Sequence, residues 1–272
     1  MDENTQEVLR VAAVIGNEFD FDLLKEASGQ DEEVLINALE IAERAQLIQE
    51  VQSKQRKAAG QEVFAFAHGL IPLSLREEIS TLRRRRLHRR VLNAVQAERS
   101  DDYETLAYHA AEACYESLAR QYTLQAAELA LNLYANREAS RYFKTVLGMD
   151  LTEADYVRVI SGLGEALFRL GEYNEAAGHW EKATEHYFSI QNYDSAARTA
   201  ARAARAYWHD DNTPKTVEIC EQYFGKIKEK VSDPAGLETP GMASLVHELA
   251  RAYRFNKQFE DALPLCRQAL EL

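Results

Sequence analysis

The segment FAFAHGL, residues 64–70, lies where two kinds of sequence pattern meet. The phenylalanines and His68 of this segment alternate with alanines, which is the two-residue period of a β-strand. Gly69 and Pro72 then interrupt the strand, and residues 73–95 have the spacing of a helix. We therefore expect a small mixed domain before this segment and a mainly helical region after it.

The residues on the N-terminal side predict three helices followed by a two-stranded hairpin. Apolar residues repeat at helical spacing in three short runs, and Asp31 is a suitable N-cap for the third. Residues 47–51 and 62–68 alternate as strands, and the polar residues 53–60 form the tip between them. Three helices followed by such a hairpin form a winged helix, which we assign to residues 1–98.

The third helix of a winged helix often approaches DNA, but here that helix is acidic. Four glutamates between residues 32 and 43 are balanced by Arg44 alone, so a duplex would be repelled. The one basic run, Arg83–Arg90, lies outside this helix, and we expect it to be solvated or to contact an acidic domain. The sequence therefore does not favour a nucleic-acid partner. A DNA-binding winged-helix regulator with a helical protein-interaction domain stays open as the alternative function.

The chain has 272 residues and is acidic, with 32 Lys and Arg against 44 Asp and Glu and a net charge of −12. No apolar run reaches the roughly 20 residues of a membrane span, so no membrane partner is expected. Three widely spaced cysteines, Cys114, Cys220 and Cys266, are expected to be free buried thiols in a reducing compartment. We therefore expect a cytoplasmic protein.

Residues 99–272 are helical in pattern throughout and contain a repeat. The spacing of small and aromatic residues around Gly164 and Trp180 is typical of a tetratricopeptide repeat (TPR). The equivalent small positions are Ala127, Gly164, Ala204 and Ala250. Their spacings of 37, 40 and 46 residues exceed the ~34 of the standard repeat. The predicted fold is mostly α, with the N-terminal winged helix followed by an α-α superhelix of TPR-like helical hairpins. We expect the array of hairpins to be truncated.

Four motifs occur in a specific order along the chain. They are LRVAAVIG at 9–16, LEIAERAQLIQ at 39–49, FAFAHGL at 64–70 and RLHRRV at 86–91. In this order, with a repeat array behind them, they resemble the region that follows the nucleotide-binding domain of bacterial STAND regulators, the signal-transducing ATPases with numerous domains. The resemblance implies a signal-sensing module in which the repeats bind a ligand and the winged helix couples binding to a nucleotide-binding domain.

The chain departs from that family in lacking a nucleotide-binding motif. No G-x-x-x-x-G-K-[ST] sequence is present, and Gly225-Lys226 lacks both the glycine-rich turn and the hydroxyl residue. We therefore expect a non-catalytic fragment without a cofactor of its own. The resemblance places ATP or ADP with Mg²⁺ in the full-length protein.

The resemblance also implies a role for His68. In the family, the histidine at the end of the wing strand contacts the phosphates of ADP, and FAFAH places His68 there. A histidine can donate a hydrogen bond to a phosphate from either ring nitrogen. The alternative is a histidine that only caps backbone groups at the end of a strand. The seven histidines show no metal-ligand spacing with the cysteines, so no metal site is expected.

A ligand surface is predicted on the concave side of the repeats. In tetratricopeptide arrays the first helix of each hairpin lines this side, through positions one, four and five after the small residue. The predicted binding residues are Phe168, Arg169, Arg205, Trp208, Arg251, Arg254 and Phe255. Arginine forks bind carboxylates and phosphates, so the predicted partner is a protein, an acidic peptide or a small anionic effector. The alternative is that the aromatic residues fill the seams between hairpins while the arginines pair with neighbouring glutamates.

Overall fold

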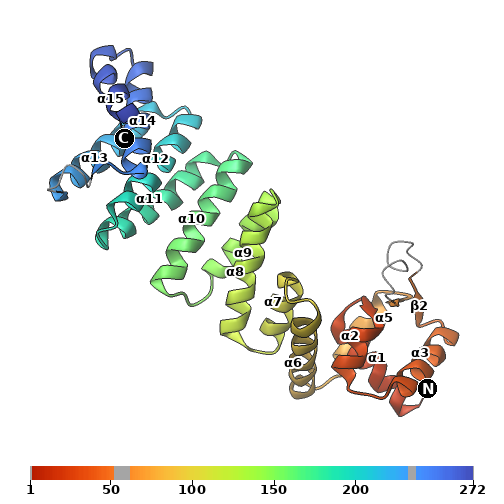
Figure 1. The fold of residues 1–272 in the computed structure, drawn as a ribbon. Helices are drawn as coiled ribbons and strands as arrows, with labels where there is room; N and C mark the ends of the chain where they lie inside the picture. The colour runs from red at the N-terminus through yellow and green to blue at the C-terminus, as the bar shows by residue number, and fades with distance from the viewer. Residues whose placement is uncertain (1, 52–61, 232–236, 272) are drawn as a thin grey trace. The chain divides into compact units, whose positions relative to one another are not determined.

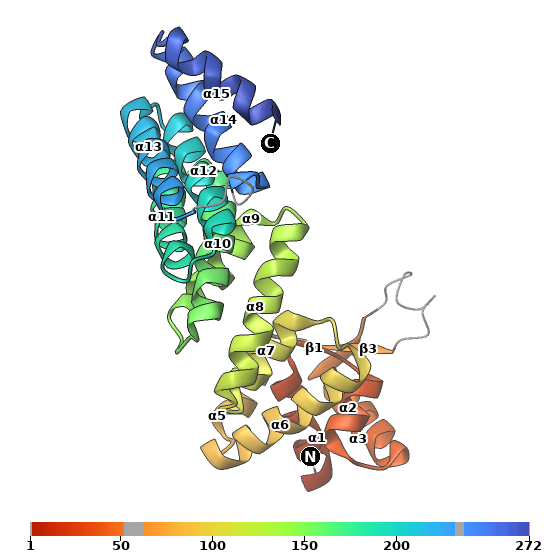
Figure 2. The ribbon, with the colours of Figure 1, turned by 60° about the vertical axis from the view of Figure 1, so that its left-hand side comes forward.

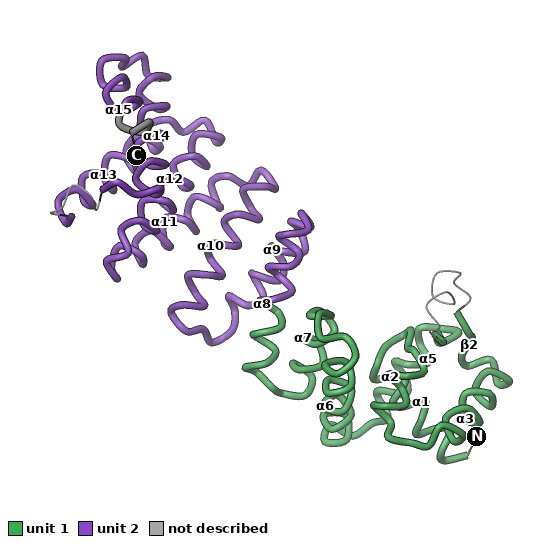
Figure 3. The backbone as a smooth tube through the Cα atoms, in the orientation of Figure 1, with its two compact units in different colours: residues 1–123 green, residues 124–272 purple. Residues whose placement is uncertain are grey.

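The structure is a computed structural model that describes residues 2–51, 62–231 and 237–271. The chain divides into two compact units, Met1–Thr123 (unit 1) and Leu124–Leu272 (unit 2), which are coloured separately in Figure 3. Fourteen helices and one three-stranded sheet lie within the described residues (Figure 1). The domain boundary predicted at 98/99 falls within unit 1, at the end of a helix, and it stays a prediction.

Unit 1 begins with three helices that are interleaved with the strands of a small sheet. Its elements are α1 (Glu3–Ile15), β1 (Glu18–Asp20), α2 (Phe21–Ser28), α3 (Glu32–Arg44), β2 (Ile48–Glu50), β3 (Val63–Phe66), α5 (Leu70–Glu77), α6 (Thr81–Glu98) and α7 (Tyr103–Glu112). The helix α8 (Glu116–Asn132) begins in unit 1 and ends in unit 2.

The sheet of unit 1 has the order β1-β3-β2, with both pairings antiparallel. Phe64 of β3 is paired with Phe19 of β1, and their rings stack at 5.9 Å between centroids. The predicted hairpin is therefore present as β2 and β3, whereas β1 was not predicted from the sequence. The predicted tip at 53–60 lies outside the described residues. The winged-helix assignment of these elements stays a prediction.

The single helix expected over residues 73–95 is wrong, because the chain forms two helices there. The first, α5, already begins at Leu70, and Pro72 lies in its first turn, where a missing amide N–H is tolerated. The second, α6, starts after Ser80, whose hydroxyl accepts a hydrogen bond from the Arg83 amide at 3.4 Å. A serine N-cap thus starts a new helix inside a run that the apolar pattern alone treats as continuous.

Unit 2 consists of helices that pack against their neighbours in chain order (Figures 1 and 2). After α8 these are α9 (Asn136–Leu147), α10 (Glu153–Leu170), α11 (Tyr173–Ser189), α12 (Tyr193–His209), α13 (Thr213–Lys230), α14 (Pro240–Phe255) and α15 (Phe259–Glu271). Most turns between them are short, and several contain a residue in the left-handed conformation, such as Gly171. Helices joined by such turns lie antiparallel, as expected for helical hairpins.

The small residues that define the repeat are buried where helices approach each other. Gly164 of α10 lies against the indole of Trp180 in α11, and a Cβ at this position would be 2.8 Å from Trp180 Nε1. That indole nitrogen donates a hydrogen bond to the backbone oxygen of Ser161 at 3.3 Å. The absence of a side chain at 164 is thus what admits the tryptophan that the repeat pattern pairs with it.

We expect Gly164→Ala to lower the free energy of unfolding by about 1–3 kcal/mol, because the added methyl overpacks the Trp180 contact. The matched control is Gly178→Ala in α11, where a Cβ meets no atom within 4 Å. That change should stabilise the helix by about 0.5–1 kcal/mol. Urea unfolding followed by circular dichroism measures both, and the prediction fails if the two variants shift in the same direction.

Two of the three thiols expected to be buried are in fact exposed. Cys220 is fully buried, but Cys114 and Cys266 are accessible to solvent. Cys114 lies just after α7 in a left-handed conformation, which places it in a turn and not on a helix face. Among the described helices, none is long and apolar enough to cross a membrane.

Candidate functional site

The helix α12 exposes a single row of arginines. Its alanines are buried, so its long polar side chains leave the helix on the remaining face. Arg198, Arg202 and Arg205 are all exposed and follow one another at four and three residues. This spacing places the three guanidinium groups on the same side of the helix.

The arginine row forms one wall of a pocket of about 500 Å³ between α12 and α14. The pocket is lined by Arg198, Ala201, Arg202, Arg205, Ala243, Ser244, His247 and Glu248. Both helices belong to unit 2, and they pack directly against each other. We call this hollow the arginine pocket.

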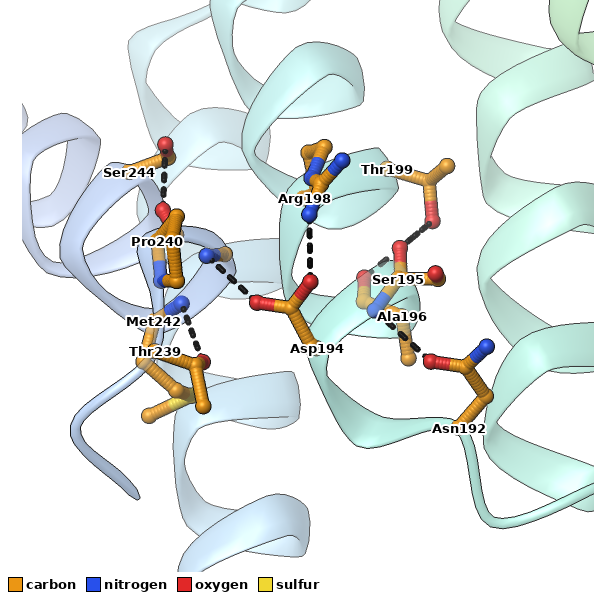
Figure 4. A network of polar contacts seen from close by, with 11 residues as sticks. Asn192, Asp194, Ser195, Ala196, Arg198, Thr199, Thr239, Pro240, Met242 and Ser244 are labelled. Atoms are coloured by element: carbon orange, nitrogen blue, oxygen red, sulfur yellow. Dashed lines mark hydrogen bonds and ion pairs between the residues drawn. The ribbon is translucent and has the colours of Figure 1, made fainter. Parts of the chain in front are cut away.

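Asp194, at the start of α12, joins this helix to α14 through a network of polar contacts that includes Arg198 of the pocket (Figure 4). Its carboxylate accepts a hydrogen bond from the Gly241 amide of α14 at 2.7 Å and another from Arg198. Burial opposes ionisation of this carboxyl, but the Gly241 amide, Thr239 and Arg198 outweigh it and lower the pKa of Asp194. A Cβ at Gly241 would be 2.1 Å from the Asp194 backbone oxygen, so glycine permits this contact between the helices.

A buried carboxylate, Glu248 of α14, also lines the pocket. Its side chain is 6% exposed, and its oxygens lie 3.5 Å from Arg205 Nε and 2.5 Å from Arg251 Nη2. Burial raises the pKa of Glu248 against the opposing effect of the two arginines, and burial also lowers the pKa of Arg251. The nearer arginine is therefore the main counter-ion of Glu248, and Arg205 is held only loosely.

Aromatic residues continue the surface beyond Glu248. The Arg251 guanidinium lies 4.9 Å from the centre of the Trp208 ring, within the range of a cation–π contact. Trp208 in turn meets Phe255 edge to face, with ring centroids 4.2 Å apart. Four of the predicted residues, Arg205, Trp208, Arg251 and Phe255, are thus brought together. Arg254 is exposed near the end of the same helix, α14.

Two predicted residues are engaged elsewhere in unit 2. Phe168 is half-buried, and its ring packs against Tyr173, Trp180 and His209. Arg169 donates to Glu165 at 2.8 Å and to the Leu131 backbone oxygen at 2.9 Å. These contacts match the alternative in which aromatic residues fill seams and arginines pair with glutamates. A binding role for any of the seven residues stays a prediction.

Sequence reasoning missed five polar residues of the arginine pocket. These are Arg198, Arg202, Ser244, His247 and Glu248. They come two to six residues before the small positions Ala204 and Ala250, whereas the prediction counted only forward from them. Counting backward along the same helix face would have found the arginines. The burial of Glu248 has no such signal, since its local sequence is that of an ordinary exposed helix position.

We expect Glu248→Ala to destabilise the chain by about 3 kcal/mol, because it leaves Arg251 largely buried without its nearest anion. The matched control is Glu165→Ala, which removes the partner of the exposed Arg169 and should cost less than about 1 kcal/mol. Chemical denaturation of both variants measures the difference. Equal losses would show that Glu248 is not a buried counter-ion.

His68 is exposed between β3 and α5. Its Nδ1 accepts a hydrogen bond from the Leu70 amide at 3.2 Å, so the proton of the neutral ring lies on Nε2. The contact has the backbone-capping geometry of the alternative given above. It also leaves Nε2–H as a donor on an exposed side chain, so the geometry is compatible with either role.

A pair of histidines in unit 1, His88 and His109, is buried away from solvent. The Nδ1 atoms of His88 and His109 are 2.9 Å apart, and both rings are buried. Burial, with smaller effects of nearby arginines, lowers the pKa of His88 to about 4, and burial lowers that of His109 to about 3. Both rings are therefore neutral, with one donating to the other. No group of three His, Cys, Asp or Glu in the described part of the chain could hold a metal ion.

No protein-family model and no curated protein matches the sequence. Among solved structures, the chain is similar to a putative kinesin light chain with nearly identical TPR-like repeats from Podosopora anserina. The TM-score is 0.53 at 21% identity, and the match covers 69% of this chain and 92% of that one. This likeness shows the fold, and the predicted array of TPR-like helical repeats is confirmed.

Two further likenesses are weaker. A STAND protein with a tetratricopeptide repeat sensor from Pyrococcus horikoshii gives a TM-score of 0.40 at 13% identity, covering 100% of this chain and 44% of that one. BtubC from P. vanneervenii gives 0.37 at 16% identity, covering 74% and 77%. TM-scores of this size support no conclusion about this chain.

Proposed function

We propose that this chain is a non-catalytic sensing and regulatory module whose repeats bind an acidic protein or peptide, or a small anionic effector, in the arginine pocket. The observation that supports the proposal is the exposed row Arg198, Arg202 and Arg205 facing a pocket of about 500 Å³. Guanidinium groups bind carboxylates and phosphates through paired, charge-assisted hydrogen bonds. A pocket of this volume is within the range that holds a ligand or a peptide side chain.

Because the rest of the chain is acidic, the arginine row is a local site of attraction for anions. With a net charge of −12, the protein as a whole repels anions, so only a local cluster of cations attracts them. Arg202 has no carboxylate within ion-pair distance among the described residues, and its guanidinium lies 5.9 Å from the Trp180 ring. Its charge is therefore available to a ligand.

The variant that tests this proposal must keep Arg251, the main counter-ion of the buried Glu248. Reversing Arg205 and Arg251 would surround the buried carboxylate with like charges, and the loss of binding would then report unfolding. The pair Arg202→Gln and Arg205→Gln removes two exposed charges from the pocket and keeps Arg251 on Glu248.

We expect this double variant to bind a fluorescein-labelled hexaglutamate peptide at least about tenfold more weakly than the unmodified chain, since charge-assisted hydrogen bonds contribute about 1.5–3 kcal/mol each. Fluorescence anisotropy at constant ionic strength measures the affinity. The control removes two exposed lysines of α13, as Lys228→Gln with Lys230→Gln, and should leave binding nearly unchanged. An equal loss in the control would place the binding outside the arginine pocket.

For unit 1 the resemblance to STAND regulators supports a finer proposal. The three helices and the hairpin act as a winged helix that couples ligand binding in the repeats to a nucleotide-binding domain, in the cytoplasm, with ATP or ADP and Mg²⁺ held by that domain. His68 contacts the ADP phosphates through Nε2–H, because its Nδ1 is occupied by the Leu70 amide. The DNA-binding alternative is not favoured, since the four glutamates of α3 are exposed.

We expect His68→Ala to speed the release of ADP and raise basal output in a protein that joins this chain to a nucleotide-binding domain. His68→Asn, which retains a side-chain amide donor, should restore part of the ADP retention. Release of a fluorescent ADP analogue measures the effect. If the alanine variant retains ADP as well as the unmodified protein does, His68 is only a cap on α5.

A further inference from the structure

The arginine pocket already contains one negative charge of its own. Glu248 lines the pocket and lies between Arg205 and Arg251. A ligand carboxylate would therefore enter beside a resident carboxylate and compete with it for Arg205. Glu248 therefore weakens the binding of any anion in this pocket, and a ligand must gain enough from the arginines to offset that repulsion.

The donors that remain are more numerous than one carboxylate can use. Each guanidinium has five N–H groups, and Arg198 and Arg205 each show one nitrogen engaged, on Asp194 and Glu248 respectively. Arg202 adds a third guanidinium without an acidic partner in the described chain. Ser244 does not add to these donors, because its hydroxyl donates to the Pro240 backbone oxygen at 2.8 Å.

A phosphomonoester matches this arrangement better than a carboxylate does. It carries a charge of about −1.5 to −2 at neutral pH and three acceptor oxygens. Three guanidinium groups within two turns of one helix can each contact a different oxygen. The stronger charge also allows the ligand to draw Arg205 away from Glu248, which keeps Arg251 as its main counter-ion.

We propose that the arginine pocket binds the phosphorylated side chain of a partner peptide, and that its three guanidinium groups make it prefer a phosphomonoester to a carboxylate. This inference rests on the function proposed above for the same pocket. Arg198, Arg202 and Arg205 hold the phosphate, and the volume of about 500 Å³ leaves room for the residues that flank it.

The test uses three nine-residue peptides that differ only at their centre, which is serine, glutamate or phosphoserine. Fluorescence anisotropy with the full chain should show phosphoserine binding at least about tenfold more tightly than glutamate, and serine not at all. Side-chain Nε resonances of the arginines, assigned by substitution, should shift for Arg198, Arg202 and Arg205. Inorganic phosphate should compete only at much higher concentration than the phosphopeptide.

Variants separate the two parts of the inference. Arg202→Gln, at an exposed position, should weaken phosphoserine binding at least about tenfold. Glu248→Gln, which keeps the shape of the side chain, should tighten the binding of both charged peptides, and that of phosphoserine at least as much, because repulsion by the resident carboxylate grows with the charge of the ligand. Its melting curve establishes that it is folded. Glu165→Gln, outside the pocket, is the matched control and should change neither affinity.

Each contrary result overturns a defined statement. Equal binding of the glutamate and phosphoserine peptides would overturn this inference and leave the proposed function intact. Inorganic phosphate binding as tightly as the phosphopeptide would make free phosphate the ligand. Unchanged affinities of both charged peptides in Glu248→Gln would show that the charge of Glu248 does not act on the ligand. No binding of phosphoserine, with hexaglutamate still bound, would exclude phosphate recognition altogether.

Discussion

The alanines of α12 determine how unit 2 is assembled around this helix. Three helices, α11, α13 and α14, pack against it, and seven of its alanines are buried at those contacts. Because a methyl group fills little space, the neighbouring backbones come close on every packed side. The long side chains of α12 are then left with one direction in which to extend. The arginines therefore form a single row partly because close packing of α12 leaves only one of its faces open.

Glu248 has the opposite character, since its position costs stability. A buried ion pair is weak evidence for stability, because desolvation of both charges offsets much of their attraction. An apolar residue at 248 would fill the same space without that cost. The carboxylate is nonetheless held at 6% exposure beside the open side chains of Arg202 and Arg205. This combination of a buried acid and exposed bases gives the pocket a charge pattern that packing alone does not require.

The repeat architecture was predictable because its signal is periodic. Small residues such as Gly164 and aromatic residues such as Trp180 must recur wherever two helices approach, so the sequence records the contact directly. A structural feature that occurs only once in the chain has no such periodic signal. The break between α5 and α6 depends on one serine cap, and β1 has three residues whose pairing partner is more than forty residues away.

The candidate site was predictable in part for the same reason. Arg205, Trp208, Arg251 and Phe255 occupy recurring positions after the small residues, and the structure brings them together. Phe168 and Arg169 occupy equivalent positions but are engaged by neighbours that differ from repeat to repeat. The burial of Glu248 depends on the packing of three helices, which no local pattern specifies.

The His88–His109 contact has a consequence for the N-terminal unit in acid. The two imidazoles share one hydrogen bond in a buried site, and their pKa values of about 4 and about 3 lie below the ordinary value of 6.5. Between pH 6.5 and about 4 the unfolded chain binds protons that the folded pair does not bind. Lowering the pH within this range therefore favours unfolding. The buried pair is therefore neutral and hydrogen-bonded at neutral pH, and its burial lowers the stability of the folded chain in acid. Acidification towards pH 4 therefore lowers the stability of the fold that holds α6 against α7, while the two rings themselves remain neutral.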